Sequence, residues 1–136
     1  MPVLDASVCV ALFNSDEPGH GPSRSWLAQA EENDGDPIVA PVILLAEVAS
    51  ALGRGLGDEE LAREVIDLLR TKRLLELFPV TATLAARAAE IAAEQKIRGC
   101  DAIYVALARQ LDTVLVTFDQ QQLERVATVV EVWMPA

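Results

Sequence analysis

The sequence has few of the residues that several common kinds of catalysis require. It contains one histidine and two cysteines in 136 residues. The histidine, His20, follows the breaker-rich stretch 16–19 and is expected to be an exposed loop residue, so Ser-His-Asp and Cys-His catalysis have little support. Cys9 and Cys100 are too few for a disulfide framework, and we expect both to be reduced thiols.

Several longer signals are also missing from the sequence. It has no Gly-rich phosphate loop, no dinucleotide-binding fingerprint and no Gly-x-Ser-x-Gly elbow. No apolar run approaches the roughly 20 residues of a membrane span, and the first residues lack the basic and apolar regions of a signal peptide. We therefore expect a cytoplasmic protein that does not associate with a membrane.

Basic residues are outnumbered by acidic ones. The chain has 11 Lys and Arg against 21 Asp and Glu, a formal net charge of −10. Such a chain is poorly suited to non-specific binding of polyanions, which depends on basic side chains that neutralise phosphates. Setting aside four acids as candidate metal ligands leaves 17 against 11, still −6. Any nucleic-acid role must therefore use a local basic patch and metal ions.

Strand-like and helix-like apolar patterns alternate along the whole chain. With 51% hydrophobic residues, we expect one domain over residues 1–136 with a sizeable core. Short β-branched runs predict strands at 2–5, 38–40, 74–80, 114–116 and 129–133. The alternation with helices predicts a three-layer α/β/α fold around a parallel sheet of about five strands.

Residues with capping preferences indicate where the helices begin. Ser23 is expected to cap the second helix, and Pro41 suits the first turn of the third. Asp101 is expected to open a helix whose body, 102–108, is apolar on all sides and therefore buried.

Two acids follow predicted strands. Asp5 ends the first strand, and Asp119 follows the strand at 114–116. Ligand sites of α/β sheets lie at the carboxyl ends of parallel strands. Ser7 and Thr117, each two residues from one of these acids, can add a hydroxyl to such a site. Either acid can instead simply cap the helix that follows it.

Two further acids lie on predicted helices. Glu47 shares a helical face with the apolar residues Leu44, Val48 and Ala51, unless it lies at the margin of that face and reaches solvent. Asp101 begins the buried helix, where capping is again an alternative.

All four acids can meet at one edge of a parallel sheet. Such a cluster repels itself unless it is protonated or binds a metal. Carboxylate oxygens without His or Cys suit Mg²⁺ or Mn²⁺ and not zinc. A magnesium site of this kind takes its remaining ligands from water and phosphate, so the pattern predicts phosphodiester hydrolysis by metal-activated water.

At this point the chain resembles the PIN-domain ribonucleases, and specifically the VapC-type toxins of VapBC toxin–antitoxin pairs. The resemblance rests on four blocks in the right order and spacing, at residues 4–7, 45–52, 101–108 and 115–119. It implies a Mg²⁺- or Mn²⁺-dependent endoribonuclease of the α/β/α PIN type, which leaves a 5′-phosphate and a 3′-hydroxyl.

The resemblance also implies roles for individual residues. The acidic quartet that binds metal and carries catalysis matches Asp5, Glu47, Asp101 and Asp119. Ser7 and Thr117 match the family's small hydroxyl positions, which contact the ligands or their bound water. One departure is Ser50, where many relatives carry Asn.

Partners follow from the same resemblance. It implies an RNA substrate, a homodimer, and a cognate VapB-type antitoxin in a larger toxin–antitoxin complex. Apolar candidates for the antitoxin groove are Leu12, Phe13, Trp26 and Leu56. The basic residues that we predict to contact RNA are Arg54, Arg70, Lys72, Arg73 and Arg98.

Two other classes of protein also use an acid at the end of the first strand. A HAD-like phosphatase needs a second Asp where this chain has Ser7. A receiver-type binding module needs an acceptor Asp after the third strand, and residues 77–80 offer none.

Overall fold

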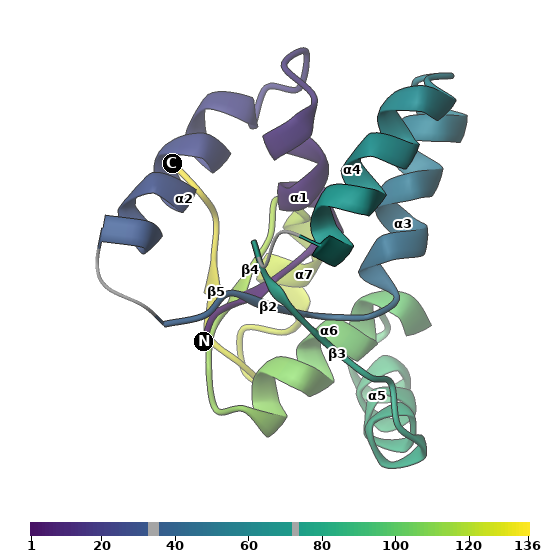
Figure 1. Ribbon diagram of the computed structural model, residues 1–136. Helices are drawn as coiled ribbons and strands as arrows, with labels where there is room; N and C mark the ends of the chain where they lie inside the picture. The colour runs from purple at the N-terminus through teal and green to yellow at the C-terminus, as the bar shows by residue number, and fades with distance from the viewer. Residues whose placement is uncertain (33–35, 72–73) are drawn as a thin grey trace.

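A parallel sheet runs through the centre of the molecule (Figure 1). The computed structural model describes residues 1–32, 36–71 and 74–136. The sheet has five strands in the order β3-β2-β1-β4-β5, and every neighbouring pair is parallel. The strands are β1 (Val3–Leu4), β2 (Val39–Pro41), β3 (Glu76–Phe78), β4 (Leu115–Val116) and β5 (Val132–Trp133). The predicted fold class is confirmed.

Helices cover both faces of this sheet. They are α1 (Ala6–Phe13), α2 (His20–Glu32), α3 (Leu44–Ser50) with its π-helical continuation η1 (Ala51–Gly55), α4 (Glu59–Thr71), α5 (Ala82–Gln95), α6 (Gly99–Gln110) and α7 (Gln120–Arg125). Figure 1 shows α1 and α2 on one side of the sheet and α5 and α6 on the other. The apolar body of α6 packs against β1, β2 and β4, which is why it is buried nearly all round.

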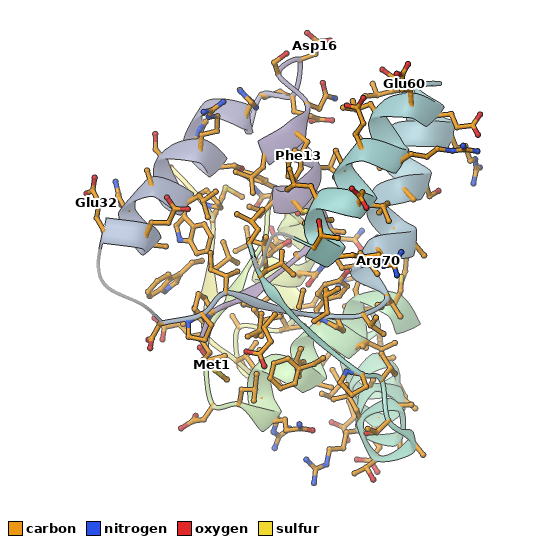
Figure 2. The ribbon with its side chains drawn as sticks, in the orientation of Figure 1. Met1, Phe13, Asp16, Glu32, Glu60 and Arg70 are labelled. Carbon is orange, nitrogen blue, oxygen red and sulfur yellow. The ribbon has the colours of Figure 1, made fainter. Side chains whose placement is uncertain are left out.

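The surface is charged, as the composition requires. Figure 2 shows Asp16 in the loop after α1, Glu32 at the end of α2 and Glu60 in the first turn of α4, all at the outside of the molecule. Within the described residues, no helix combines the length and the apolar character needed to cross a bilayer.

The connections between elements bring several chain segments to one edge of the sheet. Because all the strands are parallel, the carboxyl ends of β1, β2 and β4 lie at the same edge. Helix α3 starts directly after β2, and α6 crosses back over the sheet to feed β4, so the first turn of each helix also lies at this edge. The sheet thus assembles residues that are more than 100 positions apart in sequence.

Some predicted element boundaries were wrong. Pro41 is the last residue of β2 and not part of the third helix. The sheet needs no N–H from Pro41. Strand β2 pairs with β1 at Val39, and the hydrogen bond to β3 at Phe78 is donated by the N–H of Val42.

The start of α2 also differs from the prediction. The helix begins at His20, and Ser23 is a buried residue within it and not its cap. His20 is half-buried, and its Nδ1 lies 2.7 Å from the carbonyl oxygen of Ala11. The prediction of an exposed loop histidine was therefore wrong, because a contact with α1 extends the helix by one turn.

Candidate active site

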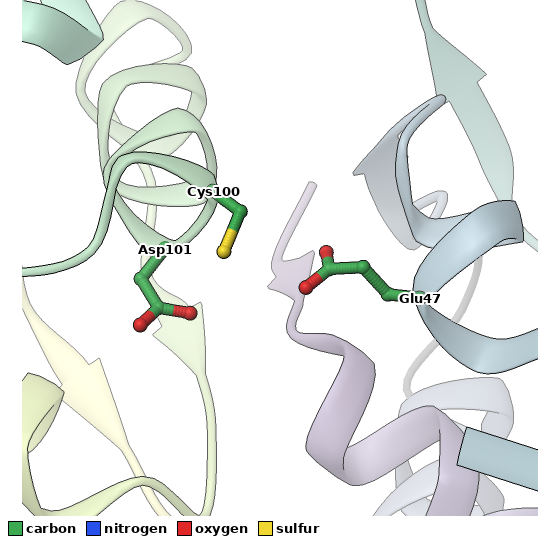
Figure 3. Close-up of side chains that lie close together, drawn as sticks. All are labelled: Glu47, Cys100 and Asp101. Atoms are coloured by element: carbon green, nitrogen blue, oxygen red, sulfur yellow. The ribbon is translucent and has the colours of Figure 1, made fainter. Parts of the chain in front are cut away.

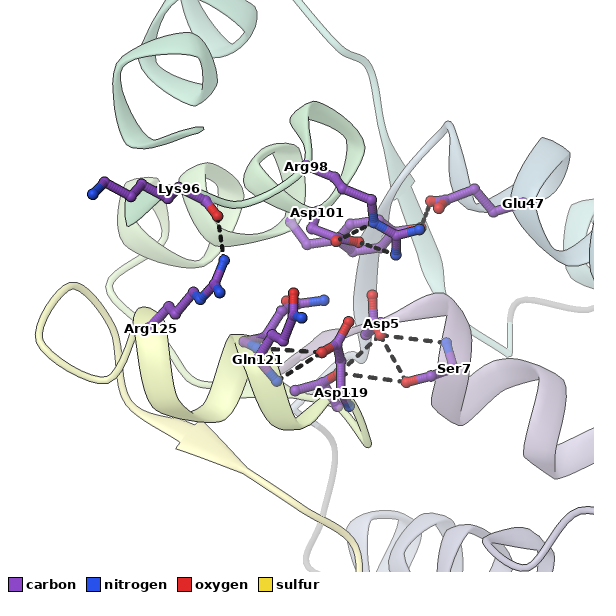
Figure 4. Close-up of polar contacts among 12 residues, drawn as sticks. Asp5, Ser7, Glu47, Lys96, Arg98, Asp101, Asp119, Gln121 and Arg125 are labelled. Carbon is purple, nitrogen blue, oxygen red and sulfur yellow. Dashed lines mark hydrogen bonds and ion pairs between the residues drawn. The ribbon is translucent and has the colours of Figure 1, made fainter. Parts of the chain in front are cut away.

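Carboxylates from three separate elements converge at the carboxyl edge of the sheet. Asp5 comes from the end of β1, Glu47 from the first turn of α3 and Asp101 from the first turn of α6. Figure 4 shows the three side chains turned toward a common space. The structure therefore brings together three of the four predicted acids, from segments separated by about 40 and 50 residues of sequence.

Asp5 is held by hydroxyl groups on one of its oxygens. Its Oδ2 accepts hydrogen bonds from Ser7 Oγ at 2.7 Å and from Thr117 Oγ1 at 2.8 Å, together with a longer bond from the Ser7 N–H. Asp5 is therefore the cap of α1, as the alternative interpretation had it. Figure 4 shows the other carboxylate oxygen pointing toward Asp101. Capping uses Oδ2 and leaves Oδ1 directed into the cluster.

The two hydroxyls also hold the chain segment that follows β4. Ser7 Oγ accepts from the N–H of Phe118, and Thr117 Oγ1 accepts from the N–H of Asp119. Each hydroxyl therefore donates to Asp5 and accepts a backbone N–H from residues 118–119. This ties the end of β4 to the end of β1.

Burial dominates the electrostatics of Asp5. The residue is 5% exposed, and burial raises the pKa of its carboxyl, opposed by the hydroxyl hydrogen bonds and reinforced by the nearby charge of Asp101. Ionising this group next to other carboxylates is therefore costly unless a cation is bound.

Glu47 is half-buried and is hydrogen-bonded to α6. The hydroxyl of Tyr104 donates to Glu47 Oε1 at 2.6 Å. Burial raises the pKa of Glu47, the Tyr104 hydrogen bond lowers it, and the charges of Asp5 and Asp101 raise it again. Glu47 is therefore tied to α6 by this hydrogen bond and is still partly exposed, so the alternative in which it reaches solvent holds in part.

Asp101 neither opens nor caps its helix, so the predicted helix start was wrong and the capping alternative is not observed. Helix α6 begins at Gly99 with Arg98 as its cap, so Asp101 is the third helical residue. Its carboxylate accepts from Arg98 Nε at 2.9 Å and from Nη2 at 3.4 Å. Asp101 is only 6% exposed, whereas the Arg98 side chain is largely in solvent. Arg98 thus partly balances the charge of the cluster from its solvent side.

Cys100 lies beside two of the acids. Ligand atoms of Glu47, Cys100 and Asp101 are all within 4.8 Å of one another (Figure 3). Burial and the charges of Asp101 and Glu47 raise the pKa of the Cys100 thiol. A protonated thiol is a poor ligand for a hard cation, so the group offers two carboxylates.

The two cysteines should differ in reactivity. Cys9 is fully buried, and burial raises the pKa of its thiol to about 12, whereas Cys100 is partly exposed. At mildly alkaline pH, where a raised pKa keeps a thiol protonated and unreactive, we expect a disulfide reagent to modify Cys100 slowly and Cys9 not at all. With a disulfide reagent whose leaving group is coloured, the native protein should release one equivalent of that group and the denatured protein two. Rapid release of two equivalents from the native protein would contradict the burial of Cys9.

Asp119 joins the cluster's hydroxyl network only through its backbone N–H, which donates to Thr117 Oγ1. It caps α7, because its Oδ1 accepts from the N–H groups of Gln121 and Gln122 at 2.9 and 3.3 Å. The alternative that Asp119 caps the next helix is therefore observed. Both capping bonds use Oδ1.

Of the three predicted RNA-contacting residues that the structure describes, only Arg98 contacts the acidic cluster. Arg54 and Arg70 are exposed on η1 and α4. Lys72 and Arg73 lie outside the described residues.

A cavity of about 460 Å³ opens beside Glu47. Ser7 and Glu47 form part of its wall, and most of the remaining lining is apolar. Phe118 contributes its ring, which lies so close to Gly19 that a Cβ at that position would be 2.7 Å from ring carbons. The site therefore has space next to Glu47 for a substrate larger than phosphate.

Tyr104 was missed by the sequence analysis. It is the only tyrosine in the chain, and it lies three residues after Asp101 in an otherwise apolar helix. That spacing places both side chains on one helical face, and a buried tyrosine hydroxyl needs a partner. These two facts together were the signal that the sequence contained.

The fold and the acidic cluster define a class, the α/β proteins that gather carboxylates at the carboxyl edge of a single parallel sheet. The PIN-domain family model matches residues 3–129. The chain therefore belongs to the PIN-domain family. No curated protein sequence matches the chain.

Solved structures with the same fold come from several bacteria. Mycobacterium tuberculosis VapC20, described as a sarcin–ricin loop cleaving toxin, has a TM-score of 0.75 at 20% identity and covers 90% of this chain and 94% of its own. VapBC2 of Rickettsia felis, bound to a promoter DNA fragment, has a TM-score of 0.75 at 17% identity, with coverages of 98% and 97%. FitAcB of Neisseria gonorrhoeae has a TM-score of 0.74 at 22% identity, with coverages of 99% and 98%.

The sheet order argues against a receiver-type module, and the family match argues against a HAD-like phosphatase. Receiver-type proteins order their strands 2-1-3-4-5, whereas this sheet is ordered β3-β2-β1-β4-β5. In place of the second Asp of a HAD-like phosphatase, Ser7 donates to Asp5, and the family match is to PIN domains.

Proposed function

We propose that this protein is a Mg²⁺- or Mn²⁺-dependent endoribonuclease and the toxin of a type II toxin–antitoxin pair. The observation that carries the nuclease assignment is the convergence of Asp5, Glu47 and Asp101 at the carboxyl edge of the sheet, where the charge of Asp101 acts on Asp5 and the charges of both act on Glu47. The PIN-domain match supports the same reaction class.

The residues of the cluster fit a divalent cation. The donors are carboxylate oxygens, which Mg²⁺ and Mn²⁺ prefer. Three acids face one another with Arg98 as a counter-charge at the solvent side, and the raised pKa values of Asp5 and Glu47 reflect burial together with an excess of negative charge. A divalent cation would neutralise that excess. We assign Asp5, Glu47 and Asp101 as its ligands, with Asp119 as a fourth acid that completes the site or orients the attacking water.

The chain's own residues position the reactants. When bound, the ion supplies Lewis-acid and charge-neutralising chemistry for phosphodiester hydrolysis. Ser7 and Thr117 hold Asp5 through its Oδ2, which keeps Oδ1 on the cluster side. The cavity beside Glu47 gives room for nucleotides that flank the scissile phosphate. Water adds to phosphorus as the bond to the 3′-oxygen breaks, leaving a 5′-phosphate and a 3′-hydroxyl.

The nuclease proposal is tested by metal dependence. Purified protein should cut a structured RNA internally in Mg²⁺ or Mn²⁺ and lose the activity in EDTA, with recovery when the ion is added back. Small phosphomonoesters should not be hydrolysed. Cleavage that persists in EDTA would overturn the metal mechanism. Mapping the 5′ ends of cellular RNA after induced expression would identify the target.

The toxin assignment rests on structural likeness and on surface character. Structures of the same fold are described as toxin–antitoxin complexes, including one from Klebsiella pneumoniae. Of the four apolar residues predicted to line an antitoxin groove, Leu56 is exposed at 47%, Leu12 is buried, and Phe13 and Trp26 pack partly against the core. Leu56 is therefore the residue of this set that is best placed for a partner. Homodimerisation stays a prediction.

The pairing of Arg98 with Asp101 at the solvent side of the cluster supports Arg98 as an RNA contact. We expect Arg98→Gln to weaken RNA binding for all sequences alike and to lower the salt dependence of log K by about 0.7, the slope for one phosphate contact on a single strand. Filter binding with a catalytically inactive variant over a range of salt concentrations measures this slope. The matched control is Arg63→Gln, since Arg63 is exposed and paired with Glu59 on α4. Equal slopes in the Arg98 variant and the wild type would remove Arg98 from the RNA interface.

A further inference from the structure

We infer that Tyr104 is a positioning residue for the metal site, which fixes the carboxylate of Glu47 through a hydrogen bond across the cluster. The inference rests on the proposed function, because it concerns how the proposed ligands are held.

The hydrogen bond joins two helices that carry different ligands. Tyr104 lies on α6 one turn after Asp101, and its hydroxyl donates to Glu47 Oε1 on α3 at 2.6 Å. Helix α3 packs chiefly against α4 and α1, and α6 packs against α5 and the sheet. The Tyr104–Glu47 bond therefore links α3 directly to α6 at the cluster, and it sets where the Glu47 carboxylate lies relative to Asp101.

Tyr104 is itself held rigidly. Its side chain is 0% exposed, and its neighbours Val105, Leu107 and Ala108 are fully buried in the same helix. A tyrosine ring packed in this way has one position for its hydroxyl. Glu47, by contrast, is half-buried and has three rotatable side-chain bonds, so its carboxylate needs an external anchor to stay in place.

The chemistry of the bond suits a ligand-positioning role. The phenol donates its one proton to Oε1, which leaves Oε2 of Glu47 available to a cation. Hydrogen bonds of this kind from outside the ligand set orient metal ligands, and their removal typically costs 10–100-fold in metal affinity or activity. A hydroxyl that served only to satisfy a buried tyrosine would affect folding and leave metal affinity unchanged.

The test is a double-mutant cycle on metal affinity. Mn²⁺ binding is measured by calorimetry for the wild type, Tyr104→Phe, Glu47→Gln and the double variant, with thermal unfolding in EDTA as the check on folding. We expect Tyr104→Phe to weaken Mn²⁺ binding about 10–100-fold in the wild-type background. In the Glu47→Gln background the same change should have less than about a two-fold effect, because the two residues act as one unit.

A second measurement does not require the Tyr104→Phe substitution. Because Tyr104 is the only tyrosine, biosynthetic 3-fluorotyrosine gives a single ¹⁹F resonance. Mg²⁺ should shift this resonance with the midpoint found for metal binding, and Glu47→Gln should abolish the shift.

The outcomes separate the inference from the proposed function. Normal Mn²⁺ binding by wild type together with unchanged affinity in Tyr104→Phe overturns the inference alone. An equal loss of Mn²⁺ affinity on Tyr104→Phe in the wild-type and Glu47→Gln backgrounds overturns the inference as well. So does a ¹⁹F resonance that does not shift when Mg²⁺ is added. No Mn²⁺ binding by the wild-type protein overturns the proposed metal site and the inference with it.

Discussion

Replacing Asp5 by Asn should lower metal-dependent RNA cleavage by more than about 100-fold, beyond the loss seen when outer contacts of a metal ligand are removed. The amide keeps the shape of the side chain and can still accept from Ser7 and Thr117 through its remaining oxygen. It removes the charge that a cation requires. Single-turnover cleavage in Mn²⁺ measures the effect.

The same substitution should not destabilise the metal-free protein at neutral pH. Asp5 is 5% exposed and its raised pKa shows that the ionised form is disfavoured by burial and by Asp101. Removing that charge relieves the repulsion, so thermal unfolding in EDTA should occur at an equal or higher temperature. Loss of activity with retained or increased stability is typical of a residue whose charge serves function.

The matched control is Asp67→Asn, which removes the same charge from an exposed position on α4. It should leave cleavage unchanged and stability within about 0.5 kcal/mol of wild type. Wild-type activity in Asp5→Asn, or a large fall in its unfolding temperature in EDTA, would assign Asp5 a structural role instead.

Divalent metal should stabilise the protein strongly near neutral pH and much less in mild acid. At a Mn²⁺ concentration about 100 times its dissociation constant, binding adds roughly 2.7 kcal/mol to the free energy of unfolding. The ligands must be deprotonated to bind, so this gain should shrink as the carboxyls take up protons. Thermal unfolding with Mn²⁺ and with EDTA, repeated across pH, measures it.

The metal-free protein should show the opposite trend. Asp5 and Glu47 have folded-state pKa values raised above 3.8 and 4.5, so the folded protein holds protons to higher pH than the unfolded chain does. Their contribution to the unfolding free energy therefore falls as pH rises from those values through the raised ones. Glu47→Gln should reduce both this fall and the Mn²⁺ effect. Stabilisation by Mn²⁺ that is equal at all pH values would place the ion elsewhere.

Much of the fold could be predicted from the sequence because its signals are local. The alternation of β-branched runs with helical apolar spacing predicted five parallel strands and their covering helices. The predicted element boundaries were wrong where a contact with another element decides them. The start of α2 depends on the contact of His20 with Ala11, and Pro41 is accommodated in β2 because β1 pairs only near Val39.

The candidate site divides in the same way. An acid in an apolar helical face, or at the end of a buried strand, stands out in the sequence because burying a carboxylate without a partner is costly. Asp5, Glu47, Asp101 and Asp119 were found on that ground. Whether Asp119 caps a helix or faces the cluster depends on its side-chain rotamer, which a sequence pattern does not encode.

The sequence alone thus determined the elements of this protein and the acids that stand out within them, since both follow from residue spacing over a few turns. Only the tertiary structure decided which groups touch those acids. Arg98 pairs with Asp101, the Cys100 sulfur lies within 4.8 Å of oxygens of Glu47 and Asp101, and the Tyr104 hydroxyl donates to Glu47. The contact between Tyr104 and Glu47 joins residues 57 positions apart, and the packing of α3 and α6 around one sheet edge sets it.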